Sequence, residues 1–483
     1  MQLPSNLGTI HIIGIGGIGM SAIAEILHAQ GFTVQGSDQK DSANVQRLRS
    51  QGIRVFVGHD AINLVGARFV VISTAVKDAN PELRAARTKG LPIIRRAEML
   101  AELMRLYATV SVTGTHGKTT TTSMIAHIFE AGSLDPTVIT GGIINDWGSN
   151  ARLGQGRWMI VEADESDGTF VKIPTQIGVV TNIDPEHLDY FGSVENMHAE
   201  YAAFYRKVPF YGLVVTCTDH PVVRDIVEKL GLRQDGRRLI TYGGEAGGSD
   251  GAPDILLTDV RVVGNITVFS AEIGSRVAGG ARRIENWQVP LPGAHNALNA
   301  LAAIAVAAEA GISDADIRSA LAAFSGVKRR FQLTGESNGV QIFDDYGHHP
   351  IEIAAVLKAA REGAQGRVIA VVEPHRYTRV RDLFDDFSAC FAAADSVVVI
   401  PLYSAGEAPI EGINPEALAE GIRGTGHRAV TTVQTPEQLA ALVKQQAKPG
   451  DMVVCLGAGV STEWAHQLPD ILGQAPQRAR GVM

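Results

Sequence analysis

The chain has 483 residues, of which 45% are hydrophobic and 19% are charged, and its formal net charge is −8. That length indicates about two to four domains rather than a single core. The 52 glycines and the modest charge content are typical of a compact soluble enzyme rather than a fibrous or disordered chain. Because the net charge is negative, the sequence carries no electrostatic footprint for nucleic acid or for an anionic membrane.

The cysteines and the apolar segments bear on disulfides, structural zinc and membrane insertion. Cys217, Cys390 and Cys455 lie far apart without metal-ligand spacing, so we expect neither disulfides nor structural zinc, but three small core residues. The N-terminal stretch lacks a basic region followed by a long apolar segment. The most apolar predicted helix contains Asn299 and is too short to span a bilayer. We expect a cytoplasmic protein without membrane insertion or nucleic-acid binding, present as a monomer or weak homodimer.

Residues 1–106 begin with a βαβ pattern, which predicts a Rossmann-like domain. The apolar strand "TIHII" leads through glycines into an amphipathic helix, and the strand "TVQGSD" follows and ends at Asp38. Gly14, Gly16 and Gly19 have G-x-G-x-x-G spacing, and with Asp38 they satisfy the dinucleotide fingerprint. Taken alone, this motif favours a nicotinamide enzyme, although a UDP-sugar also carries the pyrophosphate that such a loop holds.

Residues 107–326 alternate apolar strands such as "RWMIVE" and "QIGVVTN" with helices, which predicts a largely parallel sheet. Between Gly243 and Gln288 glycine-rich segments favour an antiparallel flap or side sheet, and a helical pair closes the domain. Residues 327–483 begin a third alternating series. We therefore expect a three-domain α/β fold: a Rossmann-like N-terminal domain, a central P-loop ATPase-like domain and a Rossmann-like C-terminal domain.

The segment "VSVTGTHGKTTTT" predicts a strand, a phosphate-binding turn and a helix. Backbone amides and the helix dipole can hold phosphate oxygens there, with the Lys118 ammonium at the β/γ-phosphates and the Thr119 hydroxyl on Mg²⁺. The alternative is an ordinary turn with a chance GKT. The longer Walker form would have its first glycine at 112, where this chain has Val112, so the loop is a shorter G-x-x-G-K-T-T variant.

Acidic and histidine side chains follow two of the central strands. Glu162 ends one strand and His187 comes after another, at the sheet edge where ligands gather in α/β folds, and both suit a metal held against ATP. The alternatives are that Glu162 is one more solvated acid in a run with Asp164, Glu165 and Asp167, and that His187 caps a backbone group.

Further candidates follow the apolar strands of the third domain. Arg376 and Arg379 could hold a carboxylate, whereas Arg381 is expected on a solvated face. Polar residues that could supply hydrogen bonds or proton transfer are Asp344, Asp345, His348 and His349. Upstream, His295, Asn296 and Asn299 could form an N-cap and first helical turn, and Arg329 and Arg330 form either a solvated pair or a phosphate clamp.

The loop variant within GTHGKTTTT resembles the Mur ligase family, the ATP-dependent amino-acid ligases of bacterial cell-wall synthesis. The resemblance extends over essentially the whole chain through E-A-D-E-S-D, N-x-x-P-x-H-x-D and H-R-Y-[ST]-R. It implies ATP and Mg²⁺ as cofactors. Most branches carry a carbamylated lysine shortly after the histidine; this chain has Tyr201 at the aligned place, so we expect no modified lysine.

The resemblance also assigns site residues. Catalytic roles are expected for Lys118, Glu162, His187 and His348, with Thr119, Glu162 and His187 on the metal. The expected nucleotide-binding residues are Gly114, Thr115, His116, Gly117, Lys118, Thr119, Thr120, His295, Asn296, Asn299, Arg330 and Asp345. The expected substrate-binding residues are Gly14, Gly16, Gly17, Gly19, Met20, Ser21, Asp38, His348, Arg376 and Arg379.

"GIGGIGMSAIAEIL", "GSD" and "NPEL" resemble the branch of the family that joins L-alanine to UDP-N-acetylmuramic acid. This implies that ATP converts the lactyl carboxylate to an acyl phosphate, which the L-alanine amine attacks, with His348 or His187 as a conceivable base. Three alternatives stay open: a murein tripeptide-recycling ligase of the same family, a nicotinamide oxidoreductase, and a non-catalytic nucleotide-sensing module.

Overall fold

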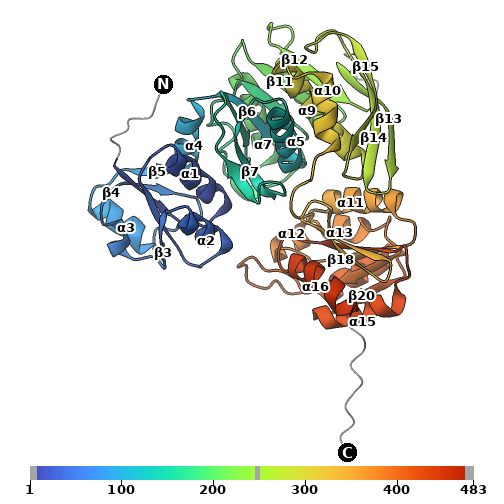
Figure 1. Ribbon diagram of the computed structural model, residues 1–483. Helices are drawn as coiled ribbons and strands as arrows, with labels where there is room; N and C mark the ends of the chain where they lie inside the picture. The colour runs from blue at the N-terminus through green and yellow to red at the C-terminus, as the bar shows by residue number, and fades with distance from the viewer. Residues whose placement is uncertain (1–7, 245–250, 474–483) are drawn as a thin grey trace, which may run out of the picture. The chain divides into compact units, whose positions relative to one another are not determined.

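The computed structural model describes residues 8–244 and 251–473, in which three sheets of 5, 10 and 6 strands follow one another along the chain (Figure 1). Each sheet is accompanied by helices from its own part of the chain, so the predicted three-domain α/β fold is confirmed. By its internal contacts the chain forms two compact units. The first comprises Met1–Asp259, Phe269–Trp287 and Leu298–Ser325, and the second comprises Val260–Val268, Gln288–Ala297 and Gly326–Met483.

The first sheet is parallel, in the order β3-β2-β1-β4-β5. Its strands are β1 (Thr9–Ile13), β2 (Val34–Asp38), β3 (Arg54–Val57), β4 (Ala67–Ile72) and β5 (Ile93–Arg95). Its helices are α1 (Ile18–Ala29), α2 (Ala43–Ser50), the 3₁₀ helix η1 (Ala61–Leu64), α3 (Pro81–Thr88) and α4 (Arg96–Met104). As expected, α1 buries its apolar face, including Met20, Ile23 and Ile26, against the sheet.

The second sheet has the order β15-β14-β13-β12-β11-β10-β6-β9-β7-β8. Its strands are β6 (Ala108–Thr113), β7 (Thr137–Ile144), β8 (Ser149–Arg152), β9 (Trp158–Glu162), β10 (Ile177–Val180), β11 (Leu213–Cys217), β12 (Leu239–Gly243), β13 (Ile255–Val263), β14 (Ile266–Ile273) and β15 (Arg282–Val289). Its helices are α5 (Lys118–Ala131), α6 (Leu188–Phe191), α7 (Val194–Lys207), α8 (Pro221–Leu230), α9 (Ala294–Glu309) and α10 (Asp314–Ala322).

Strand β6 pairs in parallel with both β9 and β10, which brings the carboxyl ends of these three strands to one edge of the sheet. Their side chains are almost all buried, as in a parallel sheet covered on both faces. The turn before α5, the end of β9 and the loop after β10 therefore meet at that edge. Between Gly243 and Gln288, where an antiparallel flap or side sheet was expected, β13, β14 and β15 continue the central sheet beyond β12.

The third sheet, in the second unit, has the order β16-β17-β21-β18-β19-β20 and is parallel apart from the antiparallel pair β16 and β17. Its strands are β16 (Gln332–Ser337), β17 (Val340–Asp345), β18 (Val368–Val372), β19 (Ser396–Val399), β20 (Val430–Thr432) and β21 (Met452–Leu456). Its helices are α11 (Pro350–Gly363), α12 (Tyr377–Asp382), α13 (Phe384–Ala389), α14 (Pro415–Gly424), α15 (Pro436–Gln446) and α16 (Ser461–Gly473).

The structure bears on the expectations about the cysteines and about membrane-spanning helices. Cys217 and Cys455 are buried as predicted, whereas Cys390 is only partly buried, and none of the three forms a disulfide. Within residues 8–244 and 251–473, none of the helices combines the length and the apolarity that crossing a bilayer requires.

Candidate active site

A cleft of about 800 Å³ lies at the carboxyl ends of β1, β2 and β4. Of the residues expected to bind substrate there, those that line it are Gly14, Gly17, Gly19, Met20 and Asp38. The Gly16 amide donates to Asp38 Oδ2 over 2.9 Å, and a Cβ at Gly16 would come within 2.9 Å of the same oxygen, so this close approach requires glycine. Ser21 is not among the lining residues, because it is buried and its hydroxyl donates to the Ile18 carbonyl over 3.0 Å.

Two further features of this cleft were not predicted. Its other wall includes Arg96, Asp164, Ser166 and Asp167, and Arg96 forms a 2.8 Å ion pair with Asp167. His59 also lines the cleft and lies 3.5 Å from the carboxylate of Glu82.

Glu82 is fully buried beside His59. Burial alone would raise the pKa of Glu82, but hydrogen bonds from His11, Ser37 and Asn63 hold it below its usual value. An ionised Glu82 therefore lies behind the His59 side of the cleft.

The turn after β6 has the backbone of a phosphate loop. Gly114 and Gly117 have φ values of +127° and +81°, in the region that favours glycine, and α5 begins at Lys118. Two of the loop amides bond within the protein: Thr115 donates to the Asn182 carbonyl over 3.1 Å and His116 to the Asn182 side chain over 2.8 Å. Of the amides at this turn, those of the first turn of α5 can still face an anion, because a helix N-terminus leaves them without helical partners.

The His116 ring faces Asp184. Its Nε2 lies 3.3 Å from one oxygen of Asp184, and His220 Nε2 lies 3.1 Å from the other. Burial would raise the pKa of Asp184, but hydrogen bonds from both histidines hold it far below the usual range. Thr115 exchanges hydrogen bonds of 3.2 and 2.8 Å with the Asp184 backbone, so this aspartate fixes the loop from two sides.

Glu162, the last residue of β9, lies beside the first turn of α5. It accepts hydrogen bonds from Thr119 Oγ1 over 3.0 Å, from Thr140 Oγ1 over 3.0 Å and from the Gly141 amide over 2.6 Å. Thr119 and Glu162 are thus brought together as the metal prediction requires. The adjacent Thr120 is buried.

Glu165 is a central residue of this edge, so the alternative interpretation of a solvated acidic run does not hold for it. Only 2% of it is exposed, and its Oε1 accepts from Lys118 Nζ over 2.8 Å. Burial raises the pKa of Glu165 to about 7 although the Lys118 ammonium lowers it. Burial would lower the pKa of Lys118, but the carboxylates of Glu165, Asp164 and Glu162 raise it.

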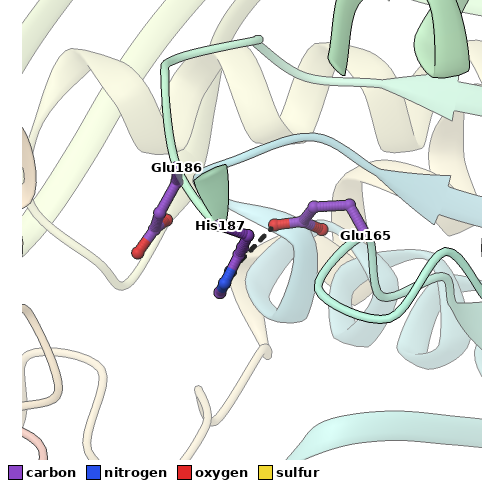
Figure 2. Close-up of side chains that lie close together, drawn as sticks. All are labelled: Glu165, Glu186 and His187. Atoms are coloured by element: carbon purple, nitrogen blue, oxygen red, sulfur yellow. Dashed lines mark ion pairs between the residues drawn. The ribbon is translucent and has the colours of Figure 1, made fainter. Parts of the chain in front are cut away.

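His187 faces Glu165 rather than standing alone after its strand. Its Nε2 lies 3.8 Å from Glu165 Oε1, and Glu165, Glu186 and His187 each place one ligand atom within 4.8 Å of the others (Figure 2). His187 has a left-handed backbone, with φ of 55°, at the start of α6. Carboxylate and imidazole ligands at these separations suit a divalent cation.

Helix α9 supplies the next group of predicted residues. In the first unit, Asn299 is buried, its Oδ1 accepts from Thr121 Oγ1 over 3.2 Å, and a Cβ on Gly117 would come within 2.7 Å of that oxygen. In the second unit, Asn296 donates to the Pro292 carbonyl over 2.8 Å and lies 3.1 Å from His295 Nε2. Burial lowers the pKa of His295 to about 4, so this imidazole is neutral at pH 7.

In the second unit, Arg329 and Arg330 both lie against the ring of Tyr346, at 4.8 and 5.4 Å from its centroid. Arg329 also donates to the Gly457 carbonyl over 2.7 Å. Asp345 is buried and accepts from the amides of Gly347 and Phe331 over 2.7 and 2.8 Å. Burial raises the pKa of Asp345 to about 6 although Arg330 and the two amides lower it.

A second cluster lies around the start of α12. The His375 ring lies 5.2 Å from His348 and 5.5 Å from Tyr403, and its Nδ1 lies 3.1 Å from a guanidinium nitrogen of Arg379. Burial and the neighbouring His348, Arg379 and Arg376 lower the pKa of His375 to about 3. Arg376, the residue just before α12, has φ of 67°, a strained backbone of the kind found at functional sites.

The loop at Glu407 and the outer face of α12 complete this region. Glu407 accepts hydrogen bonds from the Thr378 hydroxyl over 2.7 Å and from its amide over 3.0 Å. Arg381 is exposed beside Asp382, as expected for a solvated face.

Sequence models of three Mur ligase domains match most of the chain: the Mur ligase family, catalytic domain over residues 9–108, the Mur ligase middle domain over 112–307, and the Mur ligase, glutamate ligase domain over 329–459. The chain belongs to the Mur ligase family. This agrees with the resemblance inferred from its motifs.

Individual Mur ligases are similar to this one over nearly their whole length. The UDP-N-acetylmuramate–L-alanine ligase of Brucella anthropi is 59% identical, with 98% of this chain and 99% of the relative aligned. The protein of the same name from Xanthobacter autotrophicus is 57% identical, with 97% and 98% aligned. The solved UDP-N-acetylmuramate-alanine ligase of Thermotoga maritima has a TM-score of 0.78 at 27% identity, covering 96% of this chain and 98% of that one.

The structure of this Mur ligase brings several of the residues predicted to bind the nucleotide and the metal to one place. Lys118, Thr119 and Glu162 meet at one edge of the central sheet, and His187 reaches that edge through Glu165. Glu165 was missed because an acidic run looks solvated in sequence. Its place three residues after the strand-ending Glu162 was the available signal, since that spacing keeps a second carboxylate near the same edge of the sheet.

Proposed function

We propose that this chain is an ATP-dependent ligase that joins L-alanine to the lactyl carboxylate of UDP-N-acetylmuramic acid in peptidoglycan synthesis. The structural observation that carries the proposal is a four-residue acidic turn, Asp164–Asp167. On one side Asp164, Ser166 and Asp167 line the cleft behind the dinucleotide-type loop, and on the other side Glu165 bonds to Lys118 of the phosphate loop. The same turn therefore contributes side chains both to the cleft and to the phosphate loop.

The identity of the substrates is supported by the relatives. Those aligned along nearly their full length at 56–59% identity carry the name UDP-N-acetylmuramate–L-alanine ligase. These names favour the main interpretation over the recycling ligase. Membership of the Mur ligase family disfavours a nicotinamide oxidoreductase, and the cleft that satisfies the dinucleotide fingerprint is proposed to hold the UDP-sugar.

The proposed reaction proceeds by acyl activation, because a carboxylate does not expel its oxygen for an amine at neutral pH. A lactyl carboxylate oxygen attacks the γ-phosphorus of ATP, and the bond to ADP breaks, giving an acyl phosphate. The alanine amine, having lost a proton, then attacks the acyl carbon, and inorganic phosphate leaves with the bonding electrons. Lys118 and the amides of the first turn of α5 would stabilise negative charge on the transferred phosphoryl group.

Mg²⁺ fits the residues at this edge. Thr119 and Glu162 place two oxygens 3.0 Å apart, and Glu165 Oε2 is buried without a hydrogen-bond partner among the described residues, so hard oxygen ligands are available. Thr119, Glu162 and His187 are proposed to hold the ion. When bound, it supplies neutralisation of phosphate charge.

Other parts of the proposal concern the second unit and the setting. Arg330, Asp345, His295 and Asn296 are proposed nucleotide contacts, and His348, Arg376 and Arg379 are proposed contacts to the substrate carboxylate region. His348 or His187 would accept the amine proton. The division into domains at residues 106/107 and 326/327, a cytoplasmic location, and a monomer or weak homodimer remain part of the proposal.

The decisive test is a coupled assay of inorganic phosphate with purified full-length protein, ATP and Mg²⁺. We expect phosphate release only when both UDP-N-acetylmuramic acid and L-alanine are present, with glycine and L-serine as competing amines. Release without the amino acid, or nucleotide binding without turnover under any combination, would contradict a ligase and favour a nucleotide-sensing module. Oxidation of NADH with the same substrates would favour the oxidoreductase.

A further inference from the structure

The Lys118 ammonium is fully engaged by the protein. Its three donors are directed to the Gly114 carbonyl at 2.7 Å, the Thr115 carbonyl at 2.9 Å and Glu165 Oε1 at 2.8 Å. A phosphate oxygen can bond to this ammonium only if one of these acceptors gives way. The two carbonyls are part of the loop backbone and cannot move without moving the loop. The carboxylate of Glu165 can move by rotation of its side chain, so Glu165 is the partner able to leave Lys118.

Glu165 has a second set of neighbours toward which it can turn. Its carboxylate end faces His187, and Glu186 lies on the other side of that imidazole (Figure 2). Oε2 of Glu165 is buried and accepts no hydrogen bond from the described residues, although only 2% of Glu165 is exposed. A buried carboxylate oxygen without a partner is costly, and it marks a position where a ligand is expected.

The distances from Glu165 Oε1, the oxygen that now accepts from Lys118, agree with a divalent cation beside this carboxylate. Ligand atoms of one Mg²⁺ lie about 2.0–2.1 Å from the ion, so two of them are separated by up to about 4.2 Å. Glu165 Oε1 and His187 Nε2 are 3.8 Å apart, within that limit, and all three ligand atoms lie within 4.8 Å of one another. Imidazole with carboxylates also suits Mn²⁺, which makes this ion a suitable probe.

We propose that Glu165 exchanges partners during nucleotide binding: it leaves Lys118, ligates a divalent cation together with His187 and Glu186, and thereby releases the ammonium to the phosphates. This inference rests on the proposed function for the identity of the nucleotide. It makes Glu165 a metal ligand and a gate for the phosphate loop, a role additional to those of Thr119 and Glu162.

The exchange predicts coupling between cation and nucleotide, and coupling of this kind is reciprocal. A cation that removes Glu165 from Lys118 strengthens nucleotide binding, and the nucleotide strengthens cation binding by the same factor. A carboxylate that only stabilised the loop would give a different result, because its removal would weaken both ligands together.

The test measures Mn²⁺ binding by electron paramagnetic resonance and binding of a non-hydrolysable ATP analogue by calorimetry, each with and without the other ligand. In Glu165→Gln we expect Mn²⁺ affinity to fall by about tenfold or more, while the analogue binds without cation at least as tightly as it does to the wild type. Stimulation of analogue binding by Mn²⁺ should be largely lost. Asp225→Asn, which removes an exposed carboxylate on α8, is the matched control and should behave as the wild type.

The variants His187→Asn and Glu186→Gln should lower Mn²⁺ affinity without tightening the cation-free nucleotide complex, since neither residue contacts Lys118 in the way that Glu165 does. They keep the proposal testable if Glu165→Gln fails to fold, which thermal melting would reveal. Unchanged Mn²⁺ affinity in Glu165→Gln, or in Glu186→Gln if Glu165→Gln does not fold, would overturn the exchange, as would weakened cation-free nucleotide binding in Glu165→Gln. A water rather than a cation at Oε2 gives the first result. Phosphate release by the wild type, measured in parallel, tests the proposed function separately.

Discussion

Lys118 is the residue on which the phosphate chemistry depends most directly. Replacement of Lys118 by alanine should reduce phosphate release by at least about 100-fold, because a positioned charge that stabilises the transferred group is lost. Binding of UDP-N-acetylmuramic acid, measured by calorimetry, should change little. Retained turnover in the variant would count against the role of the loop.

A control is needed because Lys118 also compensates a buried carboxylate. Lys118→Ala leaves Glu165 without its ion-pair partner, which is costly at a buried position. The double variant Lys118→Ala/Glu165→Gln removes both charges and should melt closer to the wild type while remaining inactive.

Asp345 gives a pH-dependent prediction at the same scale. Its pKa rises from the usual 3.8 to about 6, so between these values the folded chain binds the proton more tightly than the unfolded chain does. The contribution of this group to the free energy of unfolding is therefore largest below pH 4 and is lost as the pH rises through 6, a change on the order of 3 kcal/mol. Asp345→Asn should remove that change, so urea melts of variant and wild type should diverge progressively between pH 4 and 7. Parallel pH profiles would refute the assignment.

At the scale of elements, the junction of β6 and α5 depends on the backbone of Gly117. An alanine there would have φ of +81° and would place its Cβ 2.7 Å from Asn299 Oδ1. Gly117→Ala should therefore displace the loop and weaken binding of the ATP analogue by tenfold or more, on the order of 1–3 kcal/mol of strain. Gly236→Ala is the matched control, since Gly236 has a φ of +73° with no atom within 4 Å of the added Cβ.

The sequence predicted elements well where a local pattern determines them. The strand, turn and helix around Gly114, and the strand ending at Glu162, are present as expected, because apolar runs and glycines act over a few residues. The placement of β13 to β15 was not predictable, since the partner of a strand is chosen by contacts distant in sequence. Burial of Glu165 was missed for the same reason: Lys118, which holds it, comes from another strand's loop.

At the scale of the molecule, the cleft makes a prediction about ligand-induced stability. UDP-N-acetylmuramic acid at 100 times its dissociation constant should stabilise the folded protein by about 2.7 kcal/mol. The corresponding rise in melting temperature should be absent with NAD⁺. The variant Asp38→Asn, which weakens the acceptor of the Gly16 amide, should need more UDP-sugar for the same rise. Equal stabilisation by NAD⁺ would contradict the proposed occupant of the cleft.

The acidic turn Asp164–Asp167 has a consequence for inhibitor chemistry. Because this turn takes part in both the cleft and the phosphate loop, the two proposed anionic occupants would both lie beside it and could be joined by a linker. Such a tethered compound would gain avidity from the high effective concentration of its second end. A uridine diphosphate connected to a phosphate mimic is therefore a rational starting scaffold. The linker length that gives the tightest binding would report the distance between the two occupants.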